Sequence, residues 1–122
     1  TFIANKLKRE KSTISFHYDR EYIRLVCRDI YYCTSEHNGS VIYTQTSTYH
    51  TRMTLSELEE QLDSVSFCRI NRGCVINLAY VQSVKGNQIN FEGQELPFYI
   101  GKSYQDAFNR ALVYYEEREY FG

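Results

Sequence analysis

Most of this chain alternates apolar and polar residues in short runs, and that period of two restricts it to a mainly β fold. Ile14, Phe16 and Tyr18 are separated by single polar residues, which is the pattern of a strand with one buried face. Further strand-forming runs follow at 22–27, 30–33, 41–46, 48–53, 81–84, 88–91 and 95–100. Turn-forming pairs such as Gly86-Asn87 separate some of these runs, so we expect antiparallel hairpins.

Three other segments refine this expectation. The run from Cys74 to Leu78 is apolar except for Asn77, and it predicts a buried strand. A polar amide inside such a run needs hydrogen-bond partners, so we expect Asn77 to be a buried anchor. Residues 19–21 predict a polar turn, and residues 35–40, which are rich in Ser, Asn and Gly, predict a surface loop.

Two helices are expected among the strands. Thr54 followed by Glu57 forms the pattern of a capping box, and it predicts a short helix with a leucine face at Leu55, Leu58 and Leu62. Near the end of the chain, Ser103 is the expected cap of a second helix. The apolar face of this helix follows the helical period and comprises Tyr104, Ala107, Phe108, Ala111, Leu112 and Tyr115.

The length of the chain, 122 residues, fits one domain with its own core. Apolar residues make up 43% of it, which argues against disorder. No apolar run reaches the roughly 18 residues that a membrane span needs, and no signal segment opens the chain. We therefore expect a cytoplasmic protein without a membrane partner. The first eleven residues mix charge with weak helical spacing and predict a linker or the fraying end of a helix.

The four cysteines do not predict a metal site. Cys27, Cys33, Cys68 and Cys74 form no C-x-x-C pair, and the three histidines do not have zinc-finger spacing. We interpret these cysteines as reduced structural residues, with a redox role or a disulfide as the alternatives. No cofactor is expected.

The charge of the chain is unevenly distributed. The formal net charge is −1, yet residues 1–28 carry 7 basic and 3 acidic side chains, and residues 69–110 carry 5 and 3. Phosphate contacts act over about 10 Å at ordinary salt, so a local basic surface is sufficient for nucleic-acid binding. A near-neutral total is weak evidence against such binding.

The segment Phe67 to Leu78, F-C-R-I-N-R-G-C-V-I-N-L, resembles the best-marked segment of the LytTR family, whose usual run is F-x-R-h-H-R-S-aromatic-h-V-N. The register is matched by Phe67, Arg69, Ile70, Arg72, Val75, Ile76 and Asn77. Three more family features occur in the expected order: D-I-Y-Y at 29–32, T-L-S-E-L at 54–58, and Leu96-Pro97 followed by Lys102 and Tyr104. Together these features cover roughly residues 13–108.

The sequence also departs from the family pattern. Thr34 stands where the family usually has Glu, Asn71 where it has His, and Gly73 where it has Ser. Cys74 replaces an aromatic residue, and Ile100 replaces a Ser near the last basic position. These departures bear on individual base contacts more than on the fold.

The resemblance implies small antiparallel sheets stacked along duplex DNA, with loops rather than a helix entering successive major grooves. It divides the chain into a linker from an absent receiver domain (1–12), a LytTR-like DNA-binding domain (13–108) and a C-terminal helix extension (109–122). The implied partners are promoter DNA with paired direct repeats, a second copy of the chain on that DNA, and a sensor histidine kinase acting through the receiver. The implied function is that of the output domain of a two-component response regulator in a bacterium.

The resemblance also implies three groups of DNA contacts. The first comes from the loop after Cys33, where His37, Asn38 or Ser40 is the contacting residue. The second is Asn71 and Arg72, and the third is Lys102. Arg and Lys side chains can read guanine edges and Asn can read adenine, whereas Arg69, Lys85 and Arg110 are better suited to phosphates.

Each of these residues also has a plainer interpretation. Asn71 can hold its own turn through an Asx-type hydrogen bond, and Arg72, His37 or Lys102 can be solvated loop residues. Other functions remain open as well. The many aromatic residues would suit an RNA- or single-strand-binding module, although no RNP-type aromatic run is present. A protein-interaction domain is a further alternative, and no sequence signature of an enzyme is found.

Overall fold

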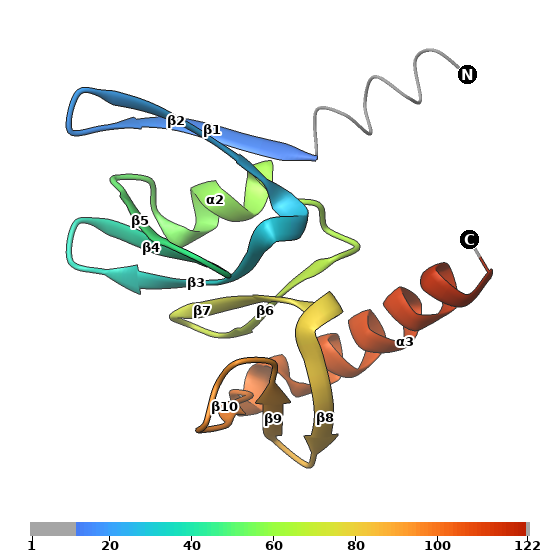
Figure 1. Ribbon diagram of the computed structural model, residues 1–122. Helices are drawn as coiled ribbons and strands as arrows, with labels where there is room; N and C mark the ends of the chain where they lie inside the picture. The colour runs from blue at the N-terminus through green and yellow to red at the C-terminus, as the bar shows by residue number, and fades with distance from the viewer. Residues whose placement is uncertain (1–11, 122) are drawn as a thin grey trace.

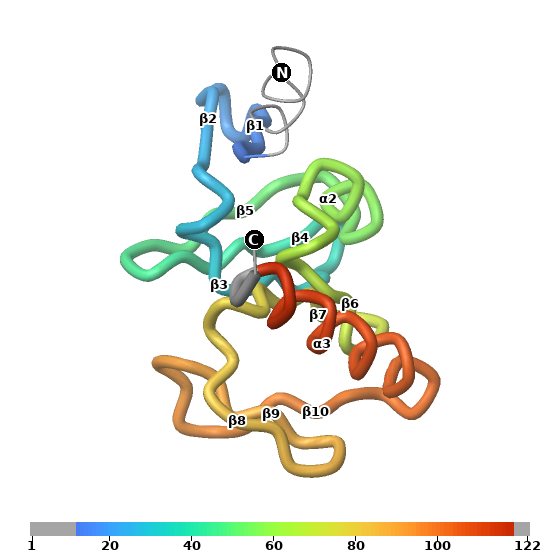
Figure 2. The backbone as a smooth tube through the Cα atoms, turned by 90° about the vertical axis from the view of Figure 1, so that its right-hand side faces the viewer, coloured from blue at the N-terminus to red at the C-terminus, as the bar shows by residue number. Residues whose placement is uncertain are grey.

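The computed structural model describes residues 12–121, with side chains described to residue 118. The expected linker, residues 1–12, lies outside this part except for Ser12. The strands form three antiparallel sheets, which confirms the expected mainly β class with small stacked sheets. Figure 1 and Figure 2 show the largest sheet in the middle, with one helix and the first hairpin on one side and the last sheet and the second helix on the other.

The first sheet is a two-stranded hairpin and the second has five strands. The hairpin consists of β1 (Thr13–Tyr18) and β2 (Glu21–Val26). The second sheet has the order β5-β4-β3-β7-β6. Its strands are β3 (Ile30–Glu36), β4 (Gly39–Thr44), β5 (Thr48–Thr51), β6 (Phe67–Asn71) and β7 (Cys74–Asn77).

The third sheet has the order β10-β9-β8. Its strands are β8 (Val81–Lys85), β9 (Gln88–Phe91) and β10 (Phe98–Tyr99). The helices are α2 (Leu55–Gln61) and α3 (Gln105–Phe121). Short 3-10 turns at Cys27–Asp29, Leu78–Tyr80 and Lys102–Tyr104 join successive elements.

Strand β7 is buried along its whole length because both faces of the five-stranded sheet are covered. Val75 belongs to the apolar core on the α2 side, whereas Cys74 and Ile76 belong to the core on the α3 side. A strand covered on both faces has no solvent-facing positions, which explains its nearly continuous apolar sequence. The prediction of a buried strand here is confirmed, although Leu78 already begins the following 3-10 turn.

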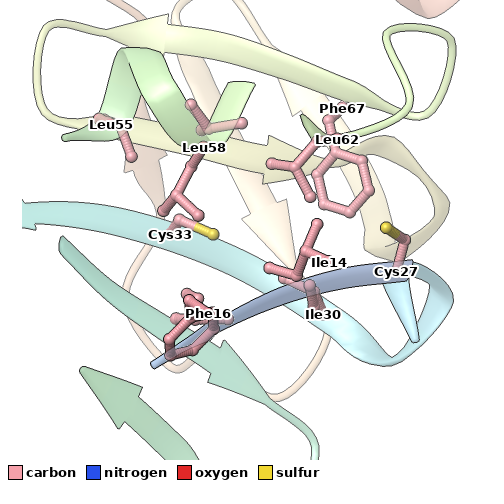
Figure 3. Packing of buried hydrophobic residues seen from close by; sticks show 11 residues of the cluster. Ile14, Phe16, Cys27, Ile30, Cys33, Leu55, Leu58, Leu62 and Phe67 are labelled. Atoms are coloured by element: carbon pink, nitrogen blue, oxygen red, sulfur yellow. The ribbon is translucent and has the colours of Figure 1, made fainter. Parts of the chain in front are cut away.

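Helix α2 fills the space between the first hairpin and the five-stranded sheet. Figure 3 shows Leu55, Leu58 and Leu62 directed into this core, where they pack with Ile14 and Cys33. All three leucines are at most 3% exposed, and burying each one stabilises the fold by about 1.5–3 kcal/mol. The predicted capping box also forms. The Thr54 hydroxyl accepts a hydrogen bond from the Glu57 amide, and the Glu57 carboxylate accepts one from the Thr54 amide.

Helix α3 covers the other face with Phe108, which is fully buried. Two details of the prediction were wrong. Ala107 is exposed, because it lies outside the stripe that faces the sheets. Ser103 is not the cap, since a 3-10 turn at Lys102–Tyr104 precedes α3 and no side chain caps that turn.

The expected loop at 35–40 is a tight hairpin instead. Strand β3 continues to Glu36 and β4 begins at Gly39, so only His37 and Asn38 form the turn. Gly39 has a φ of +156°, and a Cβ there would lie 2.0 Å from the Thr51 carbonyl oxygen. The end of β5 therefore packs so closely against this hairpin that only glycine fits.

All four cysteines are thiols without a disulfide, which agrees with the structural interpretation. Burial raises the pKa of Cys27 and Cys68 to about 11 and that of Cys74 to about 12. The pKa of Cys33 is also raised by burial. Because the thiolate is the reactive form, these side chains behave as small apolar residues at neutral pH.

Asn77 is the buried anchor that the sequence predicted. Its side chain is 2% exposed, and its amide nitrogen donates a hydrogen bond to the Ile30 carbonyl at 2.9 Å. Its amide oxygen accepts one from the Ala79 amide at 3.0 Å. One side chain therefore ties the start of β3 to the turn that leads into the third sheet.

We expect Asn77→Ala to lower the free energy of unfolding by about 1–3 kcal/mol, because the buried Ile30 carbonyl and the Ala79 amide lose their partner. Urea denaturation measures this change. Asn90→Ala is the matched control, since Asn90 is exposed and bonds only to the Ser83 hydroxyl at the surface; it should change stability by less than about 0.5 kcal/mol. Parent-like stability of Asn77→Ala would contradict the anchor role.

Candidate nucleic-acid interface

The tips of three hairpins point toward the same side of the molecule. Figure 1 shows the β1–β2, β3–β4 and β6–β7 turns at its left-hand edge, whereas the C-terminal end of α3 extends to the right. Two of these tips, the β3–β4 and β6–β7 turns, carry the first and second groups of residues predicted to contact DNA. The strands that lead into each tip contribute side chains to the two apolar cores. The backbone at each tip is therefore anchored by packed strands.

An open groove of about 720 Å³ lies between the β3–β4 hairpin, the start of α2 and the β6–β7 turn. Three arginines and one acidic residue line it together with small polar residues. The members used below are Glu36, Asn38, Arg52, Ser56, Arg69 and Arg72. We call this feature the arginine groove.

Arg69 fixes the β6–β7 turn to α2. Its guanidinium forms an ion pair with Glu59 at 2.5 Å and donates to the Ser56 hydroxyl at 3.4 Å. It also donates to the Asn71 carbonyl at 3.2 Å and to the Arg72 carbonyl. The side chain is 21% exposed, so these protein contacts occupy a group that the sequence assigned to DNA phosphates.

Asn71 shapes the same turn from within. Its amide oxygen accepts a hydrogen bond from the Gly73 amide at 2.9 Å, which is the Asx-type arrangement raised as the alternative to base contact. Its amide nitrogen donates to the Tyr99 carbonyl at 3.1 Å. The side chain therefore joins the β6–β7 turn to the end of β10.

A second contact brings the third predicted group to the same place. The Gly101 amide donates to the Ile70 carbonyl at 2.7 Å, and a Cβ at Gly101 would lie 3.5 Å from the Asn71 Cβ. Lys102 follows directly and is exposed. The structure thus brings the second and third groups, which are about thirty residues apart in sequence, into one continuous surface.

Arg72 is exposed at the apex of the β6–β7 turn and lines the arginine groove. Among the side chains that the structure describes, no carboxylate lies within ion-pairing distance of its guanidinium. Its backbone is fixed by Arg69 through the Arg72 carbonyl, while its side chain remains available for a ligand.

The residues of the first group have different environments. His37 and Asn38 are exposed at the tip of the β3–β4 hairpin. Ser40 is fully buried, and its hydroxyl donates to the Met53 carbonyl at 2.8 Å. Ser40 therefore holds the β3–β4 hairpin against the loop before α2. Its buried hydroxyl is not exposed for contact with a ligand.

The base of this hairpin tip is held by a contact between the Glu36 and His50 side chains. Glu36 contacts the Nδ1 of His50 at 2.7 Å, and the His50 ring stacks against Tyr18 with ring centroids 6.1 Å apart. Tyr18 ends β1, so the first hairpin supports the second. The sequence gives no indication of these contacts, because they depend on how β3, β4 and β5 pair and on how the first hairpin packs beside them.

Lys85 is exposed at the end of β8. Its hairpin turn is joined to the loop of Lys102, because the Ile100 amide donates to the Asn87 carbonyl at 2.8 Å. The Gln105 side chain also donates to the Gly86 carbonyl at 3.4 Å. Lys85 therefore belongs to the hairpin that supports the third group, and it is not among the residues lining the arginine groove.

Arg52 is the residue that the sequence reasoning missed. It is exposed in the loop between β5 and α2 and lines the groove with Arg72. A signal was present, since Arg52 is the single Lys or Arg between residues 29 and 68. In a segment that is otherwise acidic, a lone cation next to a capping box indicates a position where positive charge is needed.

The described residues show no candidate metal centre. Between residues 12 and 118 no cluster of His, Cys, Asp and Glu side chains could hold a metal ion. The same part of the chain has no helix long and apolar enough to span a bilayer. The arginine groove and the loops beside it are thus the best-formed candidate site.

Known proteins provide an independent comparison. A protein-family model described as the LytTr DNA-binding domain matches residues 20–113. The chain is also similar to a solved LytTr DNA-binding domain from a Bacillus cereus protein described as a methyl-accepting/DNA response regulator. The TM-score is 0.72 at 18% identity, covering 84% of this chain and 97% of that one, which establishes a shared fold. No curated protein sequence matches the chain.

The role of Arg69 can be separated from that of Arg72 by stability measurements. We expect Arg69→Ala to lower the free energy of unfolding by about 1–3 kcal/mol, because charge-assisted hydrogen bonds to Glu59 and to the turn are lost. Arg72→Ala should change it by less than about 0.5 kcal/mol, since the side chain is exposed. Urea denaturation of both variants provides the test. An equal loss of unfolding free energy in the two variants would contradict a structural role for Arg69 that Arg72 does not share.

Proposed function

The chain belongs to the LytTR DNA-binding domain family, and from this membership we propose that it binds duplex DNA sequence-specifically, as the output domain of a bacterial two-component response regulator. The receiver domain of such a regulator would lie outside this chain and would be controlled by a sensor histidine kinase. Regulation of promoters in the cytoplasm is the role that this assignment predicts. The family is a binding family, and we propose no enzymatic activity.

The observation that best supports this function is the convergence of the second and third groups. The Asn71 amide reaches the Tyr99 carbonyl, and the Gly101 amide reaches the Ile70 carbonyl. Arg72 and Lys102 therefore present two cations from adjacent loops on one surface. A pair of exposed, flexible cations on rigid loops is suited to reading guanine edges in a major groove.

We assign different roles to the predicted residues on the basis of these environments. Arg72, Lys102, His37 and Asn38 are exposed and are the proposed contacts to bases. Lys85 is the proposed phosphate contact beside Lys102, since it lies on the supporting hairpin. Arg69 and Asn71 position the β6–β7 turn, because their side chains are engaged with the protein.

Base contact by Arg72 predicts a specific loss. Arg72→Ala should weaken binding to the cognate site by about 1–3 kcal/mol and reduce the preference at one base position. Lys102→Ala should do the same if Lys102 reaches a base. If Lys102 reaches only phosphate, its removal should weaken all duplexes alike and reduce the salt dependence of binding.

The measurement is binding to cognate and scrambled duplexes at two salt concentrations, after selection of the cognate site from a random duplex library. A melting curve for each variant controls for folding. If Arg72→Ala binds the cognate duplex as tightly as the parent, the β6–β7 turn is not the reader. Preference for single-stranded DNA or RNA over every duplex would instead indicate the alternative function.

The proposed arrangement on DNA is two copies side by side on paired direct repeats. The chain shows no heptad seam that would form a dimeric coil, so we expect a monomer without DNA. Sedimentation should give one copy per single-repeat duplex and two per paired-repeat duplex. A tight dimer of the DNA-free chain would contradict this arrangement.

A further inference from the structure

We propose that the arginine groove is a binding site for the sugar-phosphate backbone of DNA and that Arg52 is its main cation. This inference rests on the proposed DNA binding and adds a contact outside the three predicted groups. The groove has one of these groups on each side, with Asn38 on the β3–β4 hairpin and Arg72 on the β6–β7 turn. Arg52 lies on the loop between them.

The backbone around Arg52 is unusually well fixed for an exposed loop. The Thr51 hydroxyl accepts a hydrogen bond from the Met53 amide at 3.2 Å, and the buried Ser40 hydroxyl donates to the Met53 carbonyl at 2.8 Å. The capping box at Thr54 follows immediately. Residues on both sides of Arg52 are therefore held, and an arginine presented from a rigid backbone loses less conformational freedom when it binds a ligand.

The charges in the groove favour an anion, since three arginines and one carboxylate line it. Arg69 is paired with Glu59, and the Glu36 carboxylate is hydrogen-bonded to the His50 ring. Among the described side chains, no carboxylate lies within ion-pairing distance of Arg52 or Arg72. Two guanidinium groups without acidic partners therefore line one concave surface, where their mutual repulsion would be relieved by a bound anion.

The position of the groove favours the DNA backbone as that anion. If the β3–β4 and β6–β7 tips contact bases on opposite sides of one DNA strand, the sugar-phosphate backbone of that strand passes between them. The surface that this strand would meet is the arginine groove. Arg is well suited to bidentate phosphate binding.

A phosphate contact has a different signature from a base contact. Each neutralised phosphate contributes about 0.9 to the slope of log K against log salt concentration. Arg52→Ala should therefore reduce this slope by about one unit and weaken binding roughly five- to ten-fold at 0.1 M salt. The loss should be the same for cognate and scrambled duplexes, so the ratio of the two affinities should not change.

The test uses the whole chain and the duplexes selected for the parent, with binding measured at four or more salt concentrations. Arg52→Lys keeps the charge and should restore most of the slope. Arg118→Ala is the matched control, because Arg118 is exposed near the end of α3, away from the hairpin tips in Figure 1. It should leave slope and affinity at parent values, and melting curves should show that all three variants are folded.

Three results would overturn the proposal. Parent-like slope and affinity in Arg52→Ala would mean that the groove does not contact the backbone, and a loss confined to the cognate duplex would make Arg52 a base reader. Saturable binding of inorganic phosphate without DNA, abolished by Arg52→Ala while duplex affinity is unchanged, would assign the groove to a small anion. Failure of the proposed function is distinguishable, since the parent itself would then show no preference among duplexes.

Discussion

The rest of the structure depends on the burial of both faces of the five-stranded sheet. Val75 and Ile76 are adjacent in β7, yet they belong to different cores. The first core is closed by α2 and the β1–β2 hairpin, and the second by the β8–β10 sheet and α3. Because a single strand takes part in both, a displacement of β7 would disturb the supports of the β3–β4 hairpin and of the β6–β7 turn together.

That construction explains how short loops can form a defined binding surface without a recognition helix. The β6–β7 turn begins where β6 ends, and Arg69 and Asn71 connect it to α2 and to the end of β10. The Asn71 and Arg72 carbonyls and the Asn71 side-chain oxygen all accept hydrogen bonds. A turn this short then has few backbone degrees of freedom left. The exposed Arg72 side chain therefore projects from a backbone that its neighbours hold in place.

The sequence predicted the elements more successfully than the contacts between them. Period and capping are local properties, so the strand at 13–18 and the capping box at Thr54 were predicted correctly from residues that are neighbours in the chain. Asn77 was also predictable, because a buried amide in an apolar run must be hydrogen-bonded. The pairing of Glu36 with His50 and the burial of Ser40 were not predictable, since both depend on how β3, β4, β5 and the following loop pack.

The near-neutral net charge is compatible with DNA binding for the same reason. The carboxylates nearest the candidate interface have protein partners, since Glu59 forms an ion pair with Arg69 and Glu36 contacts the His50 ring. The exposed carboxylates of Glu116 and Glu117 lie instead on the later part of α3, which extends away from the hairpin tips (Figure 1). On the proposed interface, an approaching duplex would experience within a Debye length the local field of Arg52, Arg72 and Lys102 rather than the total of −1.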